Sequence, residues 1–207
     1  MPIRNKSVRI RVKHMKDLIE IRWHGRGGQG AKTAALLFAD AALASGKYVQ
    51  AFPEYGPERM GAPVASFNRI ASKPILIHSG VTNPDVVIVL DPTLTDSIDV
   101  TEGVSQDGVI IVNTEKSVAD IKNDLGIAGN IKVFAVDAST ISKETIGRDI
   151  PNTPMLGALI KATGILDFNE MMDDIRKKLE KKFKSKPEVV AGNVKAIERA
   201  YKEVRSK

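Results

Sequence analysis

"LIEIRWHGRGGQGAKTAALLFADAALASG", residues 18–46, is the stretch that decides the fold. Residues 18–24 form an apolar run that suits a β-strand. Residues 31–46 have the alanine-rich pattern of a helix, and Gly46 stands where a glycine commonly ends one. Between the two lies "GRGGQG", residues 25–30, with the G-x-G-x-x-G spacing of a dinucleotide-binding turn. The stretch therefore predicts a strand, a glycine turn and a helix.

The chemistry of this turn favours an anion. Glycines permit positive φ angles and let backbone N–H groups approach a ligand at the positive end of the following helix. An arginine inside the turn adds charge, and polar side chains at the helix start can hydrogen-bond oxygen atoms. The predicted cofactor-binding set is Gly25, Arg26, Gly27, Gly28, Gln29, Gly30, Lys32 and Thr33. A turn that only packs the helix against the strand is the alternative, because the spacing alone is a weak signal.

Further strands follow the glycine turn. Residues 47–52 read as a strand stopped by Pro53, and three continuous apolar runs are typical of parallel strands covered on both faces. These runs are residues 85–91, 108–114 and 131–137. Residues 64–79 have period-two character on both sides of Lys73, which predicts an antiparallel hairpin where a regular Rossmann half has a crossover helix.

The expected fold class is therefore α/β: a Rossmann-like, mostly parallel sheet with an inserted antiparallel hairpin and C-terminal helices. We expect residues 1–18 to be a basic N-terminal extension and residues 19–207 to form a single domain. Residues 154–207 are expected to be helical, with two amphipathic helices at 168–184 and 187–205 that cover a sheet edge or contact a partner.

Composition excludes several function classes. The 207 residues are 43% hydrophobic and include no cysteine, so the chain offers no thiolate to an iron-sulfur cluster. We find neither an apolar run long enough for a membrane span nor a signal peptide, and we expect a cytoplasmic protein. The net charge is +6, but only 5% of residues are aromatic and no recognition motif accompanies the basic runs, so we expect no nucleic acid partner. His14, His24 and His78 lack metal-site spacing, so we expect no metal.

A nicotinamide cofactor fits the sequence poorly. The acid that binds the adenosine ribose in such proteins is expected at the end of the second strand, where Ala51 and Phe52 stand. Glu54 comes only after Pro53. A stand-alone NAD(P)-binding oxidoreductase is therefore kept as an alternative. We also identify no catalytic residues, since no serine lies in a nucleophile-elbow context. Asp91 and Asp137 end strands, where ligand binding and helix capping explain them equally well.

Six ordered blocks carry a family resemblance: "IRWHGRGGQGAKTAA", "GKYVQAFPEYGPERMGAPVASFNRI", "PDVVIVLDPTL", "VIIVNTEK", "AVDA" and "PNTPMLGAL". Together they closely resemble the γ subunit of 2-oxoacid:ferredoxin oxidoreductases, in the pyruvate synthase and 2-oxoisovalerate branch. The resemblance covers residues 19–205 and leaves the basic N-terminal extension outside it. Six blocks in one order are far more specific than one glycine turn.

The resemblance implies a subunit of a larger enzyme. That enzyme converts pyruvate, or a branched-chain 2-oxoacid, plus coenzyme A to acyl-CoA and CO2, and it reduces ferredoxin. Thiamine diphosphate, magnesium and iron-sulfur clusters are implied in the α, β and δ partner subunits. Coenzyme A is the implied guest of the glycine turn, since its phosphates suit an anion site. A structural subunit with no ligand is the other alternative.

The block "EYGPERMGAP" supplies a second candidate region. Ketoglutarate-type relatives usually carry an arginine followed by two glycines there, whereas this chain has Arg59 followed by Met60. Tyr55, Glu58 and Arg59 are candidate contacts to a partner subunit or cofactor, because a long loop at strand ends can reach outward. Asn152 and Thr153 join this candidate set. Stabilisation of the loop, and capping of a helix that begins near Pro154, are the structural alternatives.

Overall fold

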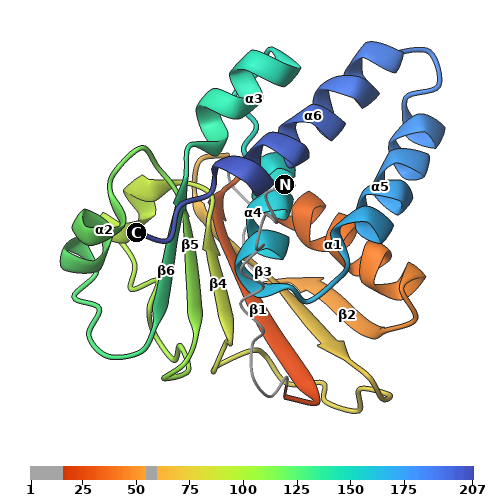
Figure 1. Ribbon diagram of the computed structural model, residues 1–207. Coiled ribbons are helices and arrows are strands. Elements are labelled where there is room, and N and C mark those ends of the chain that lie inside the picture. The colour runs from red at the N-terminus through yellow and green to blue at the C-terminus, as the bar shows by residue number, and fades with distance from the viewer. Residues whose placement is uncertain (1–15, 55–59) are drawn as a thin grey trace, which may run out of the picture.

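The fold is a six-stranded sheet with helices on both faces. The structure, a computed structural model, describes residues 16–54 and 60–207. Figure 1 shows the strands in the order β2-β3-β1-β4-β5-β6. Their bounds are β1 Leu18–Arg26, β2 Tyr48–Pro53, β3 Pro63–Ala71, β4 Val86–Val89, β5 Val109–Asn113 and β6 Lys132–Val136. The pairs β1–β4, β4–β5 and β5–β6 are parallel, while β3 runs antiparallel to both β1 and β2. The predicted α/β class is confirmed.

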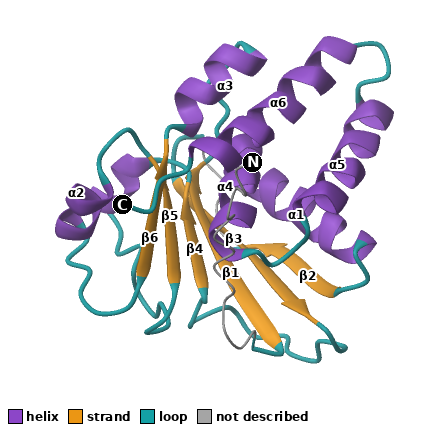
Figure 2. Ribbon diagram, viewed as in Figure 1, coloured by secondary structure: helices purple, strands orange, loops and turns teal. Residues whose placement is uncertain are grey.

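Helices lie unequally on the two faces (Figure 2). One face carries α1, α3, α4, α5 and α6, and the other carries α2. A short 3-10 helix, η1, follows β4. Their bounds are α1 Ala31–Ala44, η1 Pro92–Asp96, α2 Val118–Asp124, α3 Ala138–Ile146, α4 Asn152–Thr163, α5 Phe168–Lys182 and α6 Pro187–Glu203. The helix-capping alternative for Asp137 is confirmed, because its side chain accepts a hydrogen bond from the N–H of Thr140 at the start of α3.

The expected hairpin at residues 64–79 is wrong in its second half. Its first half is β3, but residues 74–79 form no strand, and β3 pairs instead with β2 and β1. The side-chain amide of Gln50 on β2 donates to the carbonyls of Ile75 and Ile77, at 3.5 and 3.0 Å. These carbonyls bond a side chain rather than a neighbouring strand, so alternation in so short a stretch did not indicate pairing.

The larger core lies between the sheet and the helices of one face. Alternate residues of β1 point into it, and Trp23 is fully buried there. The Trp23 indole donates to the side-chain oxygen of Asn68 on β3 at 2.8 Å, and the Asn68 amide donates to the carbonyl of Ala35 on α1 at 2.9 Å. Since a buried polar group is costly without a partner, this chain of bonds ties β1, β3 and α1 together.

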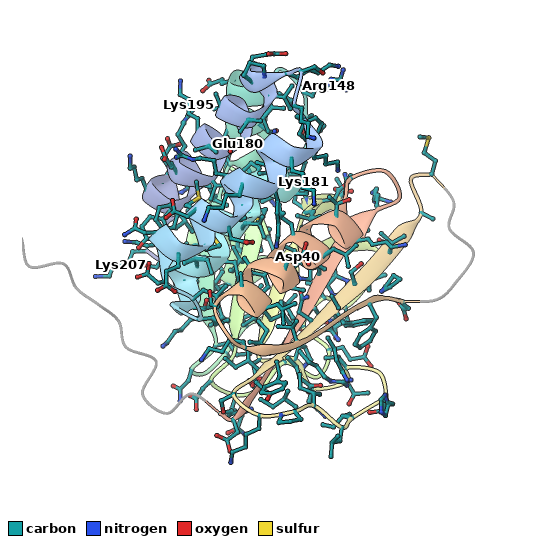
Figure 3. The ribbon with its side chains drawn as sticks, turned by 90° about the vertical axis from the view of Figure 1, so that its right-hand side faces the viewer. Asp40, Arg148, Glu180, Lys181, Lys195 and Lys207 are labelled. Atoms are coloured by element: carbon teal, nitrogen blue, oxygen red, sulfur yellow. The ribbon has the colours of Figure 1, made fainter. Side chains whose placement is uncertain are left out.

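The C-terminal helices cover a face of the sheet rather than an edge, and the alternative that they contact a partner stays a prediction. Leu156 and Leu159 of α4 share a core with Ile111 of β5. Farther from the sheet, α5 buries one apolar stripe, while Glu180 and Lys181 lie on its exposed side (Figure 3). This division of one helix into apolar and charged faces is the amphipathic pattern that the sequence predicted.

Candidate functional site

The glycine turn lies where the order of the strands across the sheet switches from one side of β1 to the other. After β1 the chain crosses through α1 to β2 on one side, and after β4 it proceeds to β5 on the other. In open α/β sheets, ligands bind in the crevice outside the carboxyl ends of two such strands. The carboxyl ends of β1 and β4 therefore mark the candidate site.

Two glycines of the turn adopt left-handed backbone conformations, Gly28 with φ 97° and Gly30 with φ 82°. A β-carbon at residue 28 would enter open space, whereas one at residue 30 would overlap the side chain of Asn152. The first intrahelical bond of α1 runs from the N–H of Ala34 to the carbonyl of Gly30, at 2.9 Å. Ahead of it, the exposed Lys32 and Thr33 occupy the first turn of the helix.

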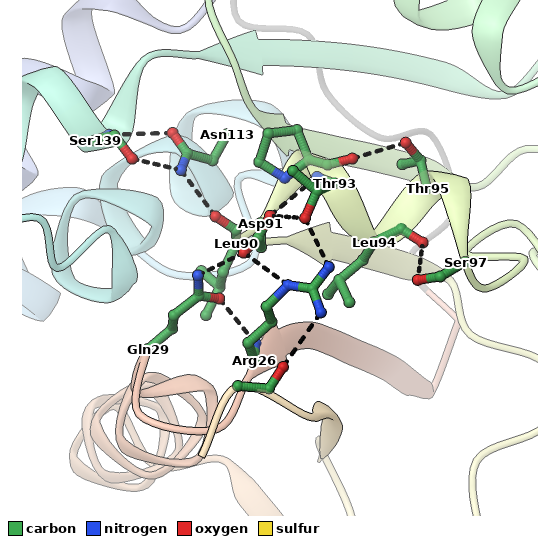
Figure 4. Close-up of polar contacts among 12 residues, drawn as sticks. Arg26, Gln29, Leu90, Asp91, Thr93, Leu94, Thr95, Ser97, Asn113 and Ser139 are labelled. Carbon is green, nitrogen blue, oxygen red and sulfur yellow. Dashed lines mark hydrogen bonds and ion pairs between the residues drawn. The ribbon is translucent and has the colours of Figure 1, made fainter. Parts of the chain in front are cut away.

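A carboxylate of the protein itself organises this turn (Figure 4). Asp91, which follows β4, accepts from Arg26 Nε at 3.2 Å and from Gln29 Nε2 at 2.7 Å. Arg26 also donates from Nη1 to the carbonyl of Gly61 at 3.2 Å and from Nη2 to Thr93 Oγ1 at 2.7 Å. The backbone N–H of Arg26 donates to Gln29 Oε1 at 2.8 Å. Asp91 thus positions Arg26 and Gln29. Each guanidinium nitrogen of Arg26 and the amide nitrogen of Gln29 donates to an acceptor within the chain.

The electrostatics of Asp91 fit this role. Burial by itself would raise the pKa of its carboxyl, but hydrogen bonds from Thr93 and Gln29 and the charge of Arg26 hold that pKa below its ordinary value. The Asp91 side chain also accepts from the N–H of Thr93 at 2.9 Å and so caps η1. Asp91 is therefore charged at neutral pH and joins the turn after β1 to the turn after β4.

Polar side chains also join the next strands along this edge. The Asn113 amide, at the end of β5, donates to the carbonyl of Leu90 at 2.8 Å and to Ser139 Oγ at 3.0 Å. Its oxygen accepts from the N–H of Ser139 at 3.1 Å. Asn113 was not among the site residues predicted from the sequence, although its place at a strand end was a usable signal. The edge from β1 to α3 is thus held by contacts within the chain.

The structure brings Asn152 to the glycine turn, and neither Asn152 nor Thr153 is the cap of α4. The helix begins at Asn152 with Pro151 before it, so both residues lie inside the first turn of α4. Asn152 Nδ2 lies 3.4 Å from the carbonyl oxygen of Gly30, and Asn152 Oδ1 accepts from the N–H of Thr153 at 2.7 Å. Both are more than nine-tenths buried. Asn152 thus joins the start of α4 to the start of α1.

The second candidate region touches the first at its described end. The N–H of Gly27 donates to the carbonyl of Ala62 at 2.8 Å, and the N–H of Gly61 donates to the carbonyl of Gly27 at 3.1 Å. Tyr55, Glu58 and Arg59 lie outside the described residues. Gly61 and Ala62, at the described end of the "EYGPERMGAP" block, therefore lie beside the glycine turn.

The sheet order gives a physical reason against a dinucleotide site. In a Rossmann half the acid that binds ribose ends a strand adjacent to β1. Here β3 lies between β1 and β2, so Glu54 follows a strand two places away from the glycine turn.

No group of three metal-ligating side chains occurs among residues 16–54 and 60–207. None of the helices described is both long and apolar enough to cross a membrane.

Comparison with known proteins gives a consistent result. The chain matches the pyruvate ferredoxin/flavodoxin oxidoreductase family over residues 20–203. It is 50% identical over 190 residues to the pyruvate synthase subunit PorC of Thermotoga maritima, covering 92% of this chain and 96% of that one. It is 52% identical over 159 residues to the pyruvate/ketoisovalerate oxidoreductases common subunit gamma of Pyrococcus abyssi. The match covers 77% of this chain and 85% of that one. A crystal structure of pyruvate oxidoreductase subunit PORC from Thermotoga maritima matches with a TM-score of 0.79 at 48% identity, covering 92% and 98%.

Proposed function

Because this chain belongs to the pyruvate ferredoxin/flavodoxin oxidoreductase family, we propose that it is the γ subunit of a 2-oxoacid:ferredoxin oxidoreductase. The complex converts pyruvate, or a branched-chain 2-oxoacid, plus coenzyme A to acyl-CoA and CO2, and it reduces ferredoxin. The observation that carries the proposal is 50% identity to a pyruvate synthase subunit across 92% of the chain. The chemistry lies on partner subunits, and this chain supplies assembly contacts.

The composition of the chain supports this division of labour. It has no cysteine, so it cannot provide the thiolate ligands of an iron-sulfur cluster. In the proposal the α, β and δ subunits hold thiamine diphosphate, magnesium and the clusters, and ferredoxin accepts electrons from the complex. In the proposal, this chain contributes the glycine turn and a surface that contacts partner subunits.

We propose that the start of α1 receives a phosphate of coenzyme A. The exposed Lys32 supplies a positive charge there, and Thr33 supplies a hydroxyl donor. The N–H groups of the first helical turn point in the same direction, ahead of the first intrahelical bond. Arg26 and Gln29 have a different role in this proposal, because their donors are engaged by Asp91, Gly61 and Thr93. They position the turn rather than hold the phosphate.

The same network favours a second candidate, a glycine turn that binds no ligand. Asp91 already gives the turn an internal anion, so the turn is stable without a bound phosphate. Replacing Lys32 with alanine separates the two functions. Coenzyme A binding predicts a KM for coenzyme A raised about tenfold with little change in kcat. An empty turn predicts no change in either. The control Lys47→Ala removes a partly exposed lysine just beyond the opposite end of α1, and it should change neither value under both functions.

Purification of the native complex through this chain tests the proposed function. We expect thiamine- and cluster-bearing subunits to co-purify at near-physiological salt, and the material to reduce ferredoxin when given a 2-oxoacid and coenzyme A. Recovery of the chain alone, with tight binding of NAD or NADP and no response to coenzyme A, would support the stand-alone oxidoreductase instead.

A further inference from the structure

The two edge strands of the sheet differ in how the chain covers them. At β6 the C-terminal segment adds a short antiparallel bridge, in which the N–H groups of Arg205 and Ala135 donate to each other's carbonyls at 2.8 and 2.9 Å. At β2, the opposite edge, no strand among residues 16–54 and 60–207 pairs with the outer side (Figure 1). Unpaired edges readily pair with a strand of another chain.

The register of β2 against β3 shows which backbone groups of β2 face outward. The N–H of Glu54 donates to the carbonyl of Ala65 at 2.9 Å, so these two residues form a hydrogen-bonded pair. Because such pairs alternate along an antiparallel ladder, the even-numbered residues of β2 also bond β3. The N–H and C=O groups of Val49 and Ala51 therefore point away from β3, along the outer edge of the sheet.

β2 lacks the features that commonly keep edge strands from pairing. Its sequence, YVQAFP, contains no charged residue, and its proline is the last residue. Tyr48 on the strand is 47% exposed, and the nearby Leu76 and Ile77 are 83% and 42% exposed. The side-chain amide of Gln50 donates to the carbonyl of Ile77, which places this second segment beside β2. An uncharged edge with exposed apolar neighbours is typical of a surface that another chain covers.

The outer edge of β2 is complementary to a copy of itself. When Gln50 lies opposite Gln50 of a second copy in an antiparallel pair, Val49 of each copy faces Ala51 of the other. Both of these facing pairs exchange hydrogen bonds, so the outward N–H and C=O groups of both strands are satisfied. A two-fold axis between the Gln50 residues presents the same surface on each copy, as closed dimers require.

The charges beside β2 favour the antiparallel arrangement. Lys47 precedes the strand and Glu54 follows it. Antiparallel pairing brings Lys47 of each copy to the end of the other strand that carries Glu54. Parallel pairing would instead place like charges together at both ends, which is unfavourable. The segment therefore carries the charge complementarity that pairing with a second copy needs.

We propose that two copies of this chain pair through β2 in antiparallel register, with the two-fold axis between the two Gln50 residues. The two sheets then form one continuous sheet. Tyr48 of each copy lies opposite Phe52 of the other, and this aromatic cross-strand contact adds to the backbone hydrogen bonds. The inference goes beyond the proposed function, because it needs only this chain.

A single engineered cysteine tests the register. The chain has no cysteine of its own, so the cysteine of Gln50→Cys can form a disulfide only with another copy. Directly opposite residues in a non-hydrogen-bonded antiparallel pair have Cα atoms about 4.5 Å apart, which a disulfide can span. We expect mild oxidation of the purified full chain to give a covalent dimer. The control Ala128→Cys, exposed in the loop before β6, should give none.

Two further variants test the contacts. Ala51→Pro removes an N–H that β3 does not use, so urea unfolding should change little. We expect its dimer dissociation constant, measured by sedimentation equilibrium, to rise on the order of a hundredfold, because half of the hydrogen bonds between the copies are lost. Tyr48→Lys, at an exposed position, should raise it about tenfold. Ala128→Lys adds the same charge far from β2 and should leave it unchanged.

The outcomes separate the possible occupants of the β2 edge. A wild-type chain that sediments only as a monomer overturns the proposal, as does a dimer that neither Ala51→Pro nor Tyr48→Lys weakens. Absence of the Gln50→Cys cross-link also overturns it. A monomeric chain whose assembly with partner subunits is blocked by Ala51→Pro shows that β2 binds a strand of a partner instead. Dimerisation through β2 without co-purifying thiamine- and cluster-bearing subunits supports this inference and contradicts the proposed function.

Discussion

A β-carbon on residue 30 would overlap the side-chain amide of Asn152, so Gly30 and Asn152 set how closely the start of α4 approaches the start of α1. The two residues are far apart in the sequence, yet they hold the first turns of two helices at one edge of the sheet (Figure 1). The glycine turn therefore fixes the packing of α1 against α4, in addition to any role in ligand binding.

Gly30→Ala should lower the free energy of unfolding by about 2 to 4 kcal/mol, because it combines backbone strain with steric overlap. Gly28→Ala is the matched control. It has a similar positive φ but open space around the new β-carbon, so we expect a loss of only about 1 kcal/mol. Urea unfolding measures both. Equal losses would show that the contact with Asn152 contributes nothing.

Asp91→Asn should destabilise the glycine turn by about 1 to 2 kcal/mol at pH 7, because it weakens the charged acceptor of Arg26 and Gln29. The pKa of Asp91 lies below its ordinary value in the folded chain. Its contribution is therefore present above about pH 4 and lost as the pH falls through the folded pKa. Urea unfolding from pH 6 to pH 3 should show a smaller acid-induced loss in the variant. A parallel loss in Asp91→Asn and wild type contradicts this, and Asp173→Asn on α5 controls for removal of an exposed carboxylate.

His24 should add a second pH dependence in a higher range. Burial and the positive charge of Arg22 lower its pKa to about 4 in the folded chain, against 6.5 ordinarily, so the unfolded chain binds a proton first as the pH falls. Stability is fully present above pH 6.5 and declines toward pH 4, by up to about 3 kcal/mol. His24→Phe should remove this decline while leaving Arg22 and the carboxylates of Glu54, Asp99 and Glu102 in place. Unfolding curves of equal pH dependence would refute the depressed pKa.

Arg69 should be among the charged residues whose loss costs most. Its side chain is 1% exposed, and it donates to Glu20 Oε1 at 2.7 Å, to Gln50 Oε1 at 3.3 Å and to the carbonyl of Gly80 at 3.0 Å. Arg69→Ala leaves these acceptors unpaired, so we expect a loss of about 3 to 5 kcal/mol. Lys178→Ala, which breaks ion pairs at a partly exposed site, should cost less than about 1 kcal/mol. Thermal unfolding compares them, and similar losses would contradict the role of Arg69.

The sequence predicted those strands and helices whose apolar residues recur with the spacing of buried positions. The run at 18–24 became β1, the alanine-rich pattern became α1, and the apolar runs became β4, β5 and β6. The pairing of β3 could not be predicted in this way, because alternation identifies a strand but not its neighbour. Residues 64–71 alternate equally well beside residues 74–79 or beside β2. Only the complete sheet selects β2 and β1 as the neighbours of β3.

The candidate site was predicted in composition but not in its connections. The pattern predicted an anion-binding turn at Gly25 to Gly30, but nothing local indicated that Asp91 would engage Arg26 across 65 positions of sequence. Asn113 was also missed, although it ends the apolar run of β5 at the carboxyl end of the sheet. Long-range hydrogen bonds of this kind depend on the sheet order, which the sequence did not reveal.

Reconstitution of the enzyme with and without this chain tests the proposed γ-subunit function most directly. The α, β and δ subunits are combined with or without the chain, and ferredoxin reduction is followed with pyruvate and a branched-chain 2-oxoacid in the presence of coenzyme A. We predict that the chain joins the complex and that full 2-oxoacid-dependent and coenzyme A-dependent activity requires it. A complex that excludes the chain and is equally active without it would contradict the γ-subunit function.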